Sequence, residues 1–113
     1  MKPGDVVLAY NPQADAKLKS RPSIVLKVIP PFGDLLVCGI STRSHNYAPE
    51  LDELITRTDE DYVLSGLEQD SLIRLGYLTT HPTQHLGKRI GSISKSRLNQ
   101  LLERLSKFLT PSN

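Results

Sequence analysis

The chain has 113 residues, 38% of them hydrophobic and 5% aromatic, which supports one compact core in a single domain over residues 1–113 and excludes two ordinary domains. Its single cysteine, Cys38, excludes an internal disulfide and a cysteine-based metal cluster, and no secretory signal or membrane-length apolar run is present, so we expect a soluble cytoplasmic protein. The net charge of +2 conceals two basic blocks, +3 over residues 1–43 and +6 over residues 71–113, around an acidic block of −7 over residues 44–70.

Three short apolar strands are predicted in the first basic block, at residues 6–10, 23–28 and 35–40. Residues 11–20 read as a polar loop between the first two strands. Pro30–Asp34 ends the second strand, because its prolines and glycine cannot continue a ladder. Neither connection could hold a crossover helix, so we expect an antiparallel, strongly bent sheet or a small barrel.

The acidic block is predicted to hold a short helix before the later strands. Thr58 is placed to cap this helix, and Asp59–Asp61 would lie in its first turn, where the helix dipole is positive. Gly66 provides a stop signal, so we expect one or two helical turns.

Two more strands are predicted after the acidic block, at residues 71–79 and 89–93. Side chains alternate between the two faces of a regular strand. Alternation along residues 71–79 therefore places Leu72, Arg74, Gly76 and Leu78 on one face and Ile73, Leu75 and Tyr77 on the other.

An amphipathic helix is predicted at the carboxy-terminal end, with Ser94 as its cap. Charged residues, Arg97 among them, are expected on its exposed face. The narrow apolar stripe and the absence of tryptophan favour docking on a core over binding to a membrane surface. The stripe consists of Leu98, Leu101, Leu102, Leu105, Phe108 and Leu109.

Two polar clusters flank the predicted strands and are candidates for an anion-binding site. Arg21–Pro22 stands directly before residues 23–28, where a guanidinium would offer bidentate geometry to a phosphate and proline would remove a donor before the ladder begins. Ser41–His45 follows the third strand with hydroxyls, a guanidinium and an imidazole. The alternatives are a solvated charge that caps the strand and a plain turn.

The sequence contains an ordered set of short motifs: Gly4–Val7, Arg21–Leu26, Ile40–Thr42, Ser65–Leu67 with Ser71–Arg74, and Ile90–Ile93 before the leucine helix. Taken in order, these motifs resemble the MazF/PemK-like toxin family from about residue 3 to residue 109. The resemblance implies a mainly β fold with α (α+β), a small SH3-like antiparallel barrel with a carboxy-terminal helix. It also implies a homodimer that cleaves RNA sequence-selectively as an endoribonuclease and is neutralised by a cognate antitoxin.

The chemistry that the resemblance implies needs neither a metal nor a cofactor. The ribose 2′-hydroxyl attacks the adjacent phosphate of single-stranded RNA and leaves a 2′,3′-cyclic phosphate and a 5′-hydroxyl. Arg21 matches the family arginine before proline and would stabilise the charge on the phosphorane. Ser41 matches a hydroxyl residue that would donate to a phosphate oxygen, and Arg74 matches an arginine that some members use in catalysis or phosphate binding. A surface charge is the alternative for Arg74.

The chain departs from the family pattern where part of the family carries an acidic residue, since Gly76 stands there. This departure leaves the general base open, with Asp70 and His45 as the candidates. His81 and His85 have no partner at metal-ligand spacing and are assigned no site.

Basic and polar residues beside the two clusters are candidates for contacts to RNA. If the fold joins the two basic blocks, they form a positive surface suited to a polyanion, with the acidic block on the opposite side; an ordinary mixed surface is the alternative. Tyrosines could stack on splayed bases, although core packing is the more common use for Tyr77. The candidates are Lys17, Lys19, Thr42, Arg43 and His45 for RNA binding and Tyr10, Tyr47 and Tyr77 for stacking.

Two further readings compete with a toxin ribonuclease. A non-catalytic toxin or binding module of the same barrel, such as a gyrase poison, is favoured by the missing acid at Gly76. A structural interaction protein, which recruits partners through its leucine helix or a barrel edge, is the third reading.

Overall fold

The structure is a computed structural model that describes residues 1–12, 18–42 and 47–111, without the side chains of residues 10–12, 18 and 19. Its six strands form one antiparallel sheet in the order β4-β5-β3-β2-β1-β6, accompanied by helices α1 and α2 and the 3₁₀ turn η2. The expected mainly β fold with α is confirmed. The elements are β1 (Asp5–Pro12), β2 (Leu18–Ile29), β3 (Asp34–Ser41), β4 (Glu53–Ile55), α1 (Tyr62–Ser65), β5 (Ser71–His81), η2 (Thr83–His85), β6 (Leu86–Ser92) and α2 (Lys95–Leu109).

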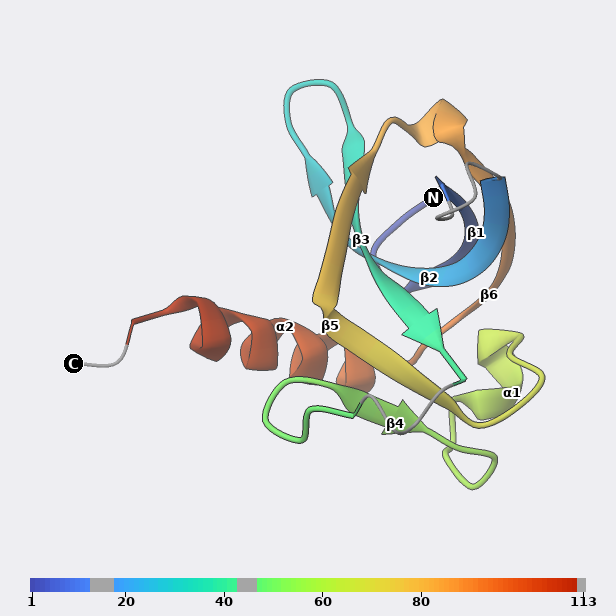
Figure 1. Cartoon of the computed structure of the whole chain (residues 1–113), viewed down its shortest axis with the longest axis vertical. Coiled ribbons are helices and arrows are strands. Elements are labelled where there is room, and N and C mark those ends of the chain that lie inside the picture. The colour runs from blue at the N-terminus through green and yellow to red at the C-terminus, as the bar shows by residue number, and fades with distance from the viewer. Residues whose placement is uncertain (13–17, 43–46, 112–113) are drawn as a thin grey trace.

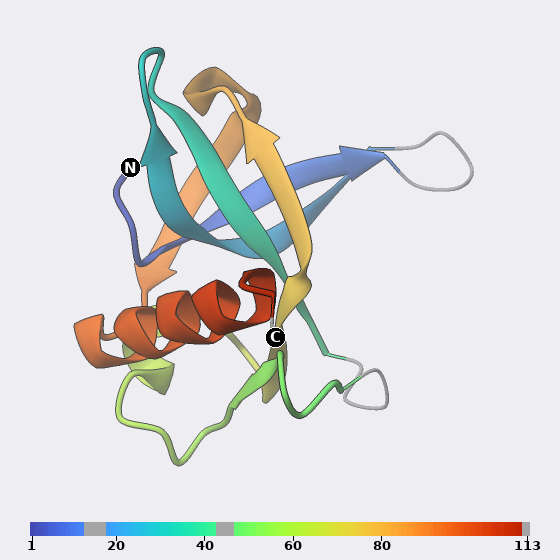
Figure 2. The same cartoon turned by 90° about the vertical axis from the view of Figure 1, so that its left-hand side faces the viewer.

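The sheet curls around itself without closing, because its order ends at the edge strands β4 and β6 (Figures 1 and 2). Apolar residues are buried on both faces of this curl. Val6, Ile24 and Cys38 belong to a larger core that includes α2, whereas Val7 and Val25 belong to a smaller core with no helix. Burial on both faces explains why these strands read as continuous apolar runs instead of alternating ones.

The strands β1 and β2 form a longer hairpin than the sequence predicts. Their pairing continues to Pro12 opposite Leu18, so the ends of the predicted loop over residues 11–20 are strand. The expectation that Pro22 precedes the ladder is therefore wrong, because Pro22 lies inside β2 opposite Leu8. Proline is tolerated there because β2 pairs with β3 only from Ser23 onward, which leaves one side of the backbone without a ladder.

The predicted strand at residues 71–79 is present as β5, but it does not alternate regularly. Cys38 pairs with Leu78, yet the next residue of β3, Gly39, pairs with Arg74. Residues 75–77 are therefore extra residues on β5, and such a bulge changes the face toward which the following side chains point. The predicted faces of residues 71–79 hold only up to this irregularity.

The acidic block differs from its prediction at two points. Its short helix, α1, begins after Asp61 and not after Thr58, and it ends at Gly66, which has a φ of 75°. Thr58 instead pairs its hydroxyl with that of Thr56 at 3.0 Å. The three-residue edge strand β4 was not predicted, since so short a segment carries no recognisable period.

Helix α2 begins as predicted, with the Ser94 hydroxyl accepting a hydrogen bond from the Arg97 backbone at 3.1 Å. The expectation that Arg97 is exposed is wrong. Its buried guanidinium contacts Glu53 at 2.7 Å, Asp59 at 3.2 Å and Asp61 at 2.9 Å. The acidic block therefore anchors α2, which a helical wheel cannot show because the partners lie on other segments.

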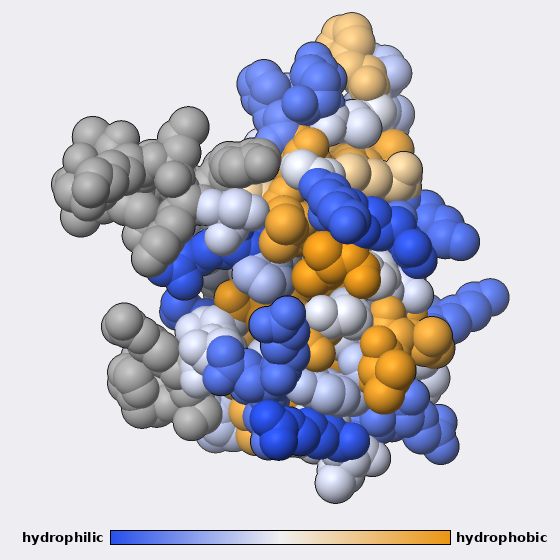
Figure 3. Space-filling model, turned by 90° about the vertical axis from the view of Figure 1, so that its right-hand side faces the viewer, coloured by the Kyte–Doolittle hydropathy of each residue, from blue (hydrophilic) through white to orange (hydrophobic). Residues whose placement is uncertain are grey.

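The apolar stripe of α2 is buried only in its first part. Leu101 and Leu105 pack into the core, whereas Phe108 and Leu109 are exposed where the helix projects beyond the sheet (Figure 1). Hydrophobic residues also reach the surface on another face of the molecule, between hydrophilic groups (Figure 3). Neither helix in the described part of the chain is long and apolar enough to cross a membrane.

Candidate active site

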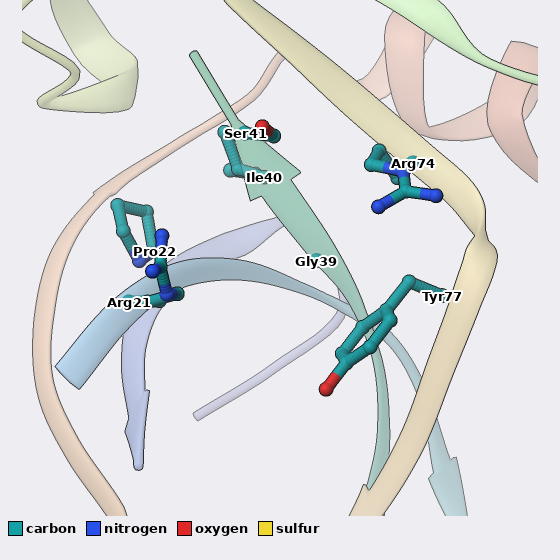
Figure 4. Close-up of a pocket in the computed structure, with 7 residues that line it drawn as sticks. All are labelled: Arg21, Pro22, Gly39, Ile40, Ser41, Arg74 and Tyr77. Atoms are coloured by element: carbon teal, nitrogen blue, oxygen red, sulfur yellow. The ribbon is translucent and has the colours of Figure 1, made fainter. Parts of the chain in front are cut away.

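Three neighbouring strands line one pocket of about 180 Å³. Strand β2 contributes Arg21 and Pro22, β3 contributes residues 39–41, and β5 contributes Arg74 and Tyr77 (Figure 4). Of these seven described lining residues, two are arginines and none is acidic. Such a pocket suits an anion that a planar guanidinium can bind through two parallel hydrogen bonds. Phosphate is the common biological example.

The register of the sheet explains why Arg21 and Ser41 meet. Ser23 and Gly39 form the last pair of β2 and β3, and Arg21 and Ser41 lie two residues beyond this pair on their own strands. Residues two apart on a strand share a face, and both side chains therefore reach the same side of the sheet. Arg21 and Ser41 both line this pocket.

Arg74 reaches the pocket from the other side of β3. Gly39 pairs with Arg74 on β5 and with Ser23 on β2, so β3 runs between the two arginine-bearing strands. The Nε atom of Arg74 is buried and has no hydrogen-bond partner within the described part of the structure. A buried donor without a partner costs free energy, and a bound anion in this pocket would supply the missing acceptor.

Tyr77 lines the pocket although the sequence placed it on the opposite face from Arg74. The bulge at residues 75–77 turns its side chain to the pocket side, and 43% of Tyr77 remains exposed. The preference for a core role was therefore wrong. Gly76 in the middle of a strand was the available signal, because an interior glycine often marks a bulge.

The other residues predicted to bind RNA cannot all be placed. Thr42 is exposed and follows Ser41, but it is not among the described residues that line the pocket. Lys17, Arg43 and His45 lie outside the described residues, and so does the side chain of Lys19. Their contacts to RNA stay a prediction.

The residues considered for acid–base or metal chemistry lie away from the pocket where they are described. The Asp70 carboxylate accepts a hydrogen bond from the Arg57 backbone at 2.9 Å and does not line the cavity. His81 pairs with the Thr79 hydroxyl at 2.9 Å, and His85 ends η2. Across the described ranges, no group of three His, Cys, Asp or Glu side chains could hold a metal ion.

The chain was compared with protein families, curated proteins and solved structures. Residues 2–109 match the model of the PemK-like, MazF-like toxin of type II toxin–antitoxin systems. The comparison with curated proteins found no match.

The solved structures that share the fold include two from mycobacteria. The Mycobacterium tuberculosis toxin MazF-mt6 is 24% identical with a TM-score of 0.66, and the match covers 91% of this chain and 93% of that one. An endoribonuclease in complex with its cognate antitoxin, from a mycobacterial species, is 13% identical with a TM-score of 0.71, and the match covers 100% and 99% of the two chains. Because the family model spans nearly the whole sequence, the chain belongs to the family of PemK-like, MazF-like toxins of type II toxin–antitoxin systems.

Proposed function

We propose that this protein is the toxin of a type II toxin–antitoxin system and cleaves single-stranded RNA as a sequence-selective, metal-independent endoribonuclease. The observation that carries the proposal is the meeting of Arg21, Ser41 and Arg74, from three strands, in one pocket without a carboxylate among its described lining residues. Membership of a toxin family known for endoribonucleases supports the same conclusion.

In the proposed reaction, the RNA supplies its own nucleophile. The ribose 2′-hydroxyl attacks the adjacent phosphorus, the bond to the 5′-oxygen breaks, and a 2′,3′-cyclic phosphate and a 5′-hydroxyl result. Negative charge builds on the non-bridging oxygens as the phosphorane forms. Arg21 and Arg74 would face this charge from opposite sides of β3, and Ser41 would donate a hydrogen bond to one of the oxygens.

The proposal is tested by incubating the purified protein with single-stranded RNA in the presence of a chelator. We expect cleavage with cyclic phosphate ends by the wild type, and a loss of about a hundredfold or more in kcat for Arg21→Ala or Arg74→Ala. Lys27→Ala is the matched control, because Lys27 is an exposed cation on β2 and does not line the pocket. Intact RNA after incubation with the wild type would contradict the proposal.

A non-catalytic toxin of the same fold is the second candidate, and the absence of an acid at Gly76 favours it. Such a protein would leave RNA whole in the assay above. If it were a gyrase poison, it would instead stall supercoiling by purified gyrase. The two candidates therefore give opposite results in two assays on the same preparation.

A cognate antitoxin is the proposed protein partner, and the proposed assembly of the free toxin is a homodimer. One structure of the same fold is described as an endoribonuclease in complex with its cognate antitoxin. An acidic antitoxin segment would complement the two arginines of the pocket. Co-expression with the neighbouring reading frame should yield a complex whose RNA cleavage is blocked, and light scattering of the free toxin should give twice the chain mass.

A further inference from the structure

We propose that the hydroxyl of Tyr77 is the general acid of the cleavage reaction and gives its proton to the departing 5′-oxygen. This inference rests on the ribonuclease function proposed above. It assigns a proton donor to a site in which the family's acidic residue is replaced by Gly76.

The bulge in β5 decides which side chain reaches the pocket next to Arg74. Cys38 pairs with Leu78 and Gly39 with Arg74, so one step along β3 corresponds to four residues along β5. A Cβ atom on Gly76 would lie 3.4 Å from Cδ2 of Leu51, which is not among the described pocket residues. A side chain at position 76 would therefore point toward Leu51, and Tyr77 takes the place beside Arg74.

The ring of Tyr77 lies against the backbone of β3. A Cβ atom on Gly39 would lie 3.0 Å from Cδ1 of Tyr77 and 3.6 Å from its Cγ, so the missing side chain at position 39 makes room for the ring. Figure 4 shows the ring extending from β5 across β3, with the hydroxyl at the end far from β5 and on the side away from Arg74 and Ser41. The residue is 43% exposed, so part of it is open to solvent and to a bound RNA strand.

The chemistry of the other lining residues leaves the phenol as the best proton donor. Guanidinium groups keep their protons and can only stabilise charge, so Arg21 and Arg74 cannot protonate a leaving oxygen. The described pocket offers two hydroxyls, those of Ser41 and Tyr77, and a phenol is intrinsically more acidic than an aliphatic alcohol.

The proposed step balances without any further reactant. The bond between the 2′-oxygen and phosphorus forms while the bond between phosphorus and the 5′-oxygen breaks, and the phenol proton moves to the 5′-oxygen. The proton of the 2′-hydroxyl is released to solvent, and the phenolate recovers a proton from solvent. The site is then ready for another turnover.

The test compares two RNA oligonucleotides that contain the bond cut by the wild type. One is ordinary RNA, and in the other a sulfur atom replaces the bridging 5′-oxygen of the scissile bond. A thiolate leaves without being protonated, so the second substrate does not need a general acid. Tyr77→Phe keeps the ring and removes only the hydroxyl, and its folding is checked by circular dichroism and thermal denaturation.

We expect Tyr77→Phe to cut ordinary RNA about a hundredfold more slowly in kcat, at an unchanged KM, and to cut the sulfur-substituted RNA at the wild-type rate. Arg21→Ala should remain slow on both substrates, because charge stabilisation is needed in either case. Equal rates of Tyr77→Phe and wild type on ordinary RNA would overturn the role of Tyr77. A defect of Tyr77→Phe on both substrates would also overturn it. A wild type that leaves both RNAs intact would overturn the ribonuclease function itself.

Discussion

At the scale of single residues, the candidate site depends on the absence of a side chain as much as on the arginines. Gly39 lies within β3, where it pairs with Ser23 on one side and Arg74 on the other. The ring of Tyr77 occupies the space that a side chain at position 39 would fill. A glycine in the interior of a strand weakens the strand, but at this position it allows the ring of Tyr77 to pack closely against β3.

Gly39→Ala should therefore disturb the site through Tyr77. The added methyl group would stand 3.0 Å from Cδ1 of Tyr77 and push the ring away from β3. We expect slower RNA cleavage by Gly39→Ala and almost no additional loss when it is combined with Tyr77→Phe, because residues in contact are not additive. Single-turnover kinetics on the two single variants and the double variant measure this coupling. Independent, additive losses would contradict it.

At the scale of elements, α2 is attached to the acidic block by one buried arginine. Arg97 lies in the first turn of α2, where a cation opposes the helix dipole, so its carboxylate partners must compensate. Asp61 accepts two hydrogen bonds from the guanidinium, at 2.9 and 3.2 Å, and one from the Ser94 backbone at 3.1 Å. Burial alone would raise the pKa of Asp61, but these hydrogen bonds and the charge of Arg97 hold it below its ordinary value.

Arg97→Met should destabilise the fold strongly, although methionine keeps much of the apolar volume. The substitution leaves the buried carboxylate of Asp61 without its cation, and losing one partner of a buried pair costs about 3–5 kcal/mol. Lys107→Met is the matched control, because Lys107 is an exposed cation on the same helix. Urea denaturation of both variants compares their free energies of unfolding. Equal free energies of unfolding of the two variants would show that the ion pairs of Arg97 contribute nothing to stability.

At the scale of the whole molecule, residues of the acidic block make contacts that hold the fold together. Glu53, Asp59 and Asp61 contact Arg97, and Asp52 accepts a hydrogen bond from the Leu75 backbone at 3.1 Å. The sequence divides charge into blocks, but the structure pairs part of the acidic block with a cation of the second basic block. The simple picture of an acidic face opposite a basic one therefore does not describe these residues.

The free energy of unfolding should decrease as the pH falls, most steeply below about pH 4, where unfolded aspartates take up protons. Burial opposes ionisation of Asp5, but hydrogen bonds from the Lys2 backbone and from Arg89 lower its pKa, as Arg97 lowers that of Asp61. A carboxylate whose pKa is lowered by folding stabilises the fold at any pH above its pKa in the unfolded state. This stabilisation is lost as the pH falls through its pKa in the folded state. Burial also lowers the pKa of His81, which acts in the same direction at milder pH.

Denaturant unfolding at a series of pH values from 7 to 2 measures this dependence. The Arg97→Met variant provides the control, because it removes the interaction that lowers the pKa of Asp61 and should show a weaker decrease in acid. A free energy of unfolding that rises on acidification would contradict the lowered pKa values of Asp5 and Asp61.

Local patterns determined much of the fold from the sequence alone. The apolar runs predict β1, β2 and β3, and the leucine spacing with Ser94 predicts α2, because these signals lie within one segment and follow the period of its own backbone. The order of short motifs predicts the family, and two residues from those motifs, Arg21 and Ser41, line one cavity.

The tertiary structure alone decided where three other side chains lie. Tyr77 turns into the pocket because β5 slips against β3, Pro22 is tolerated because β3 pairing stops at Ser23, and Arg97 is buried because three acids from distant segments surround it. Each outcome depends on a neighbouring strand or segment, and a period read along one segment contains no information about its neighbours.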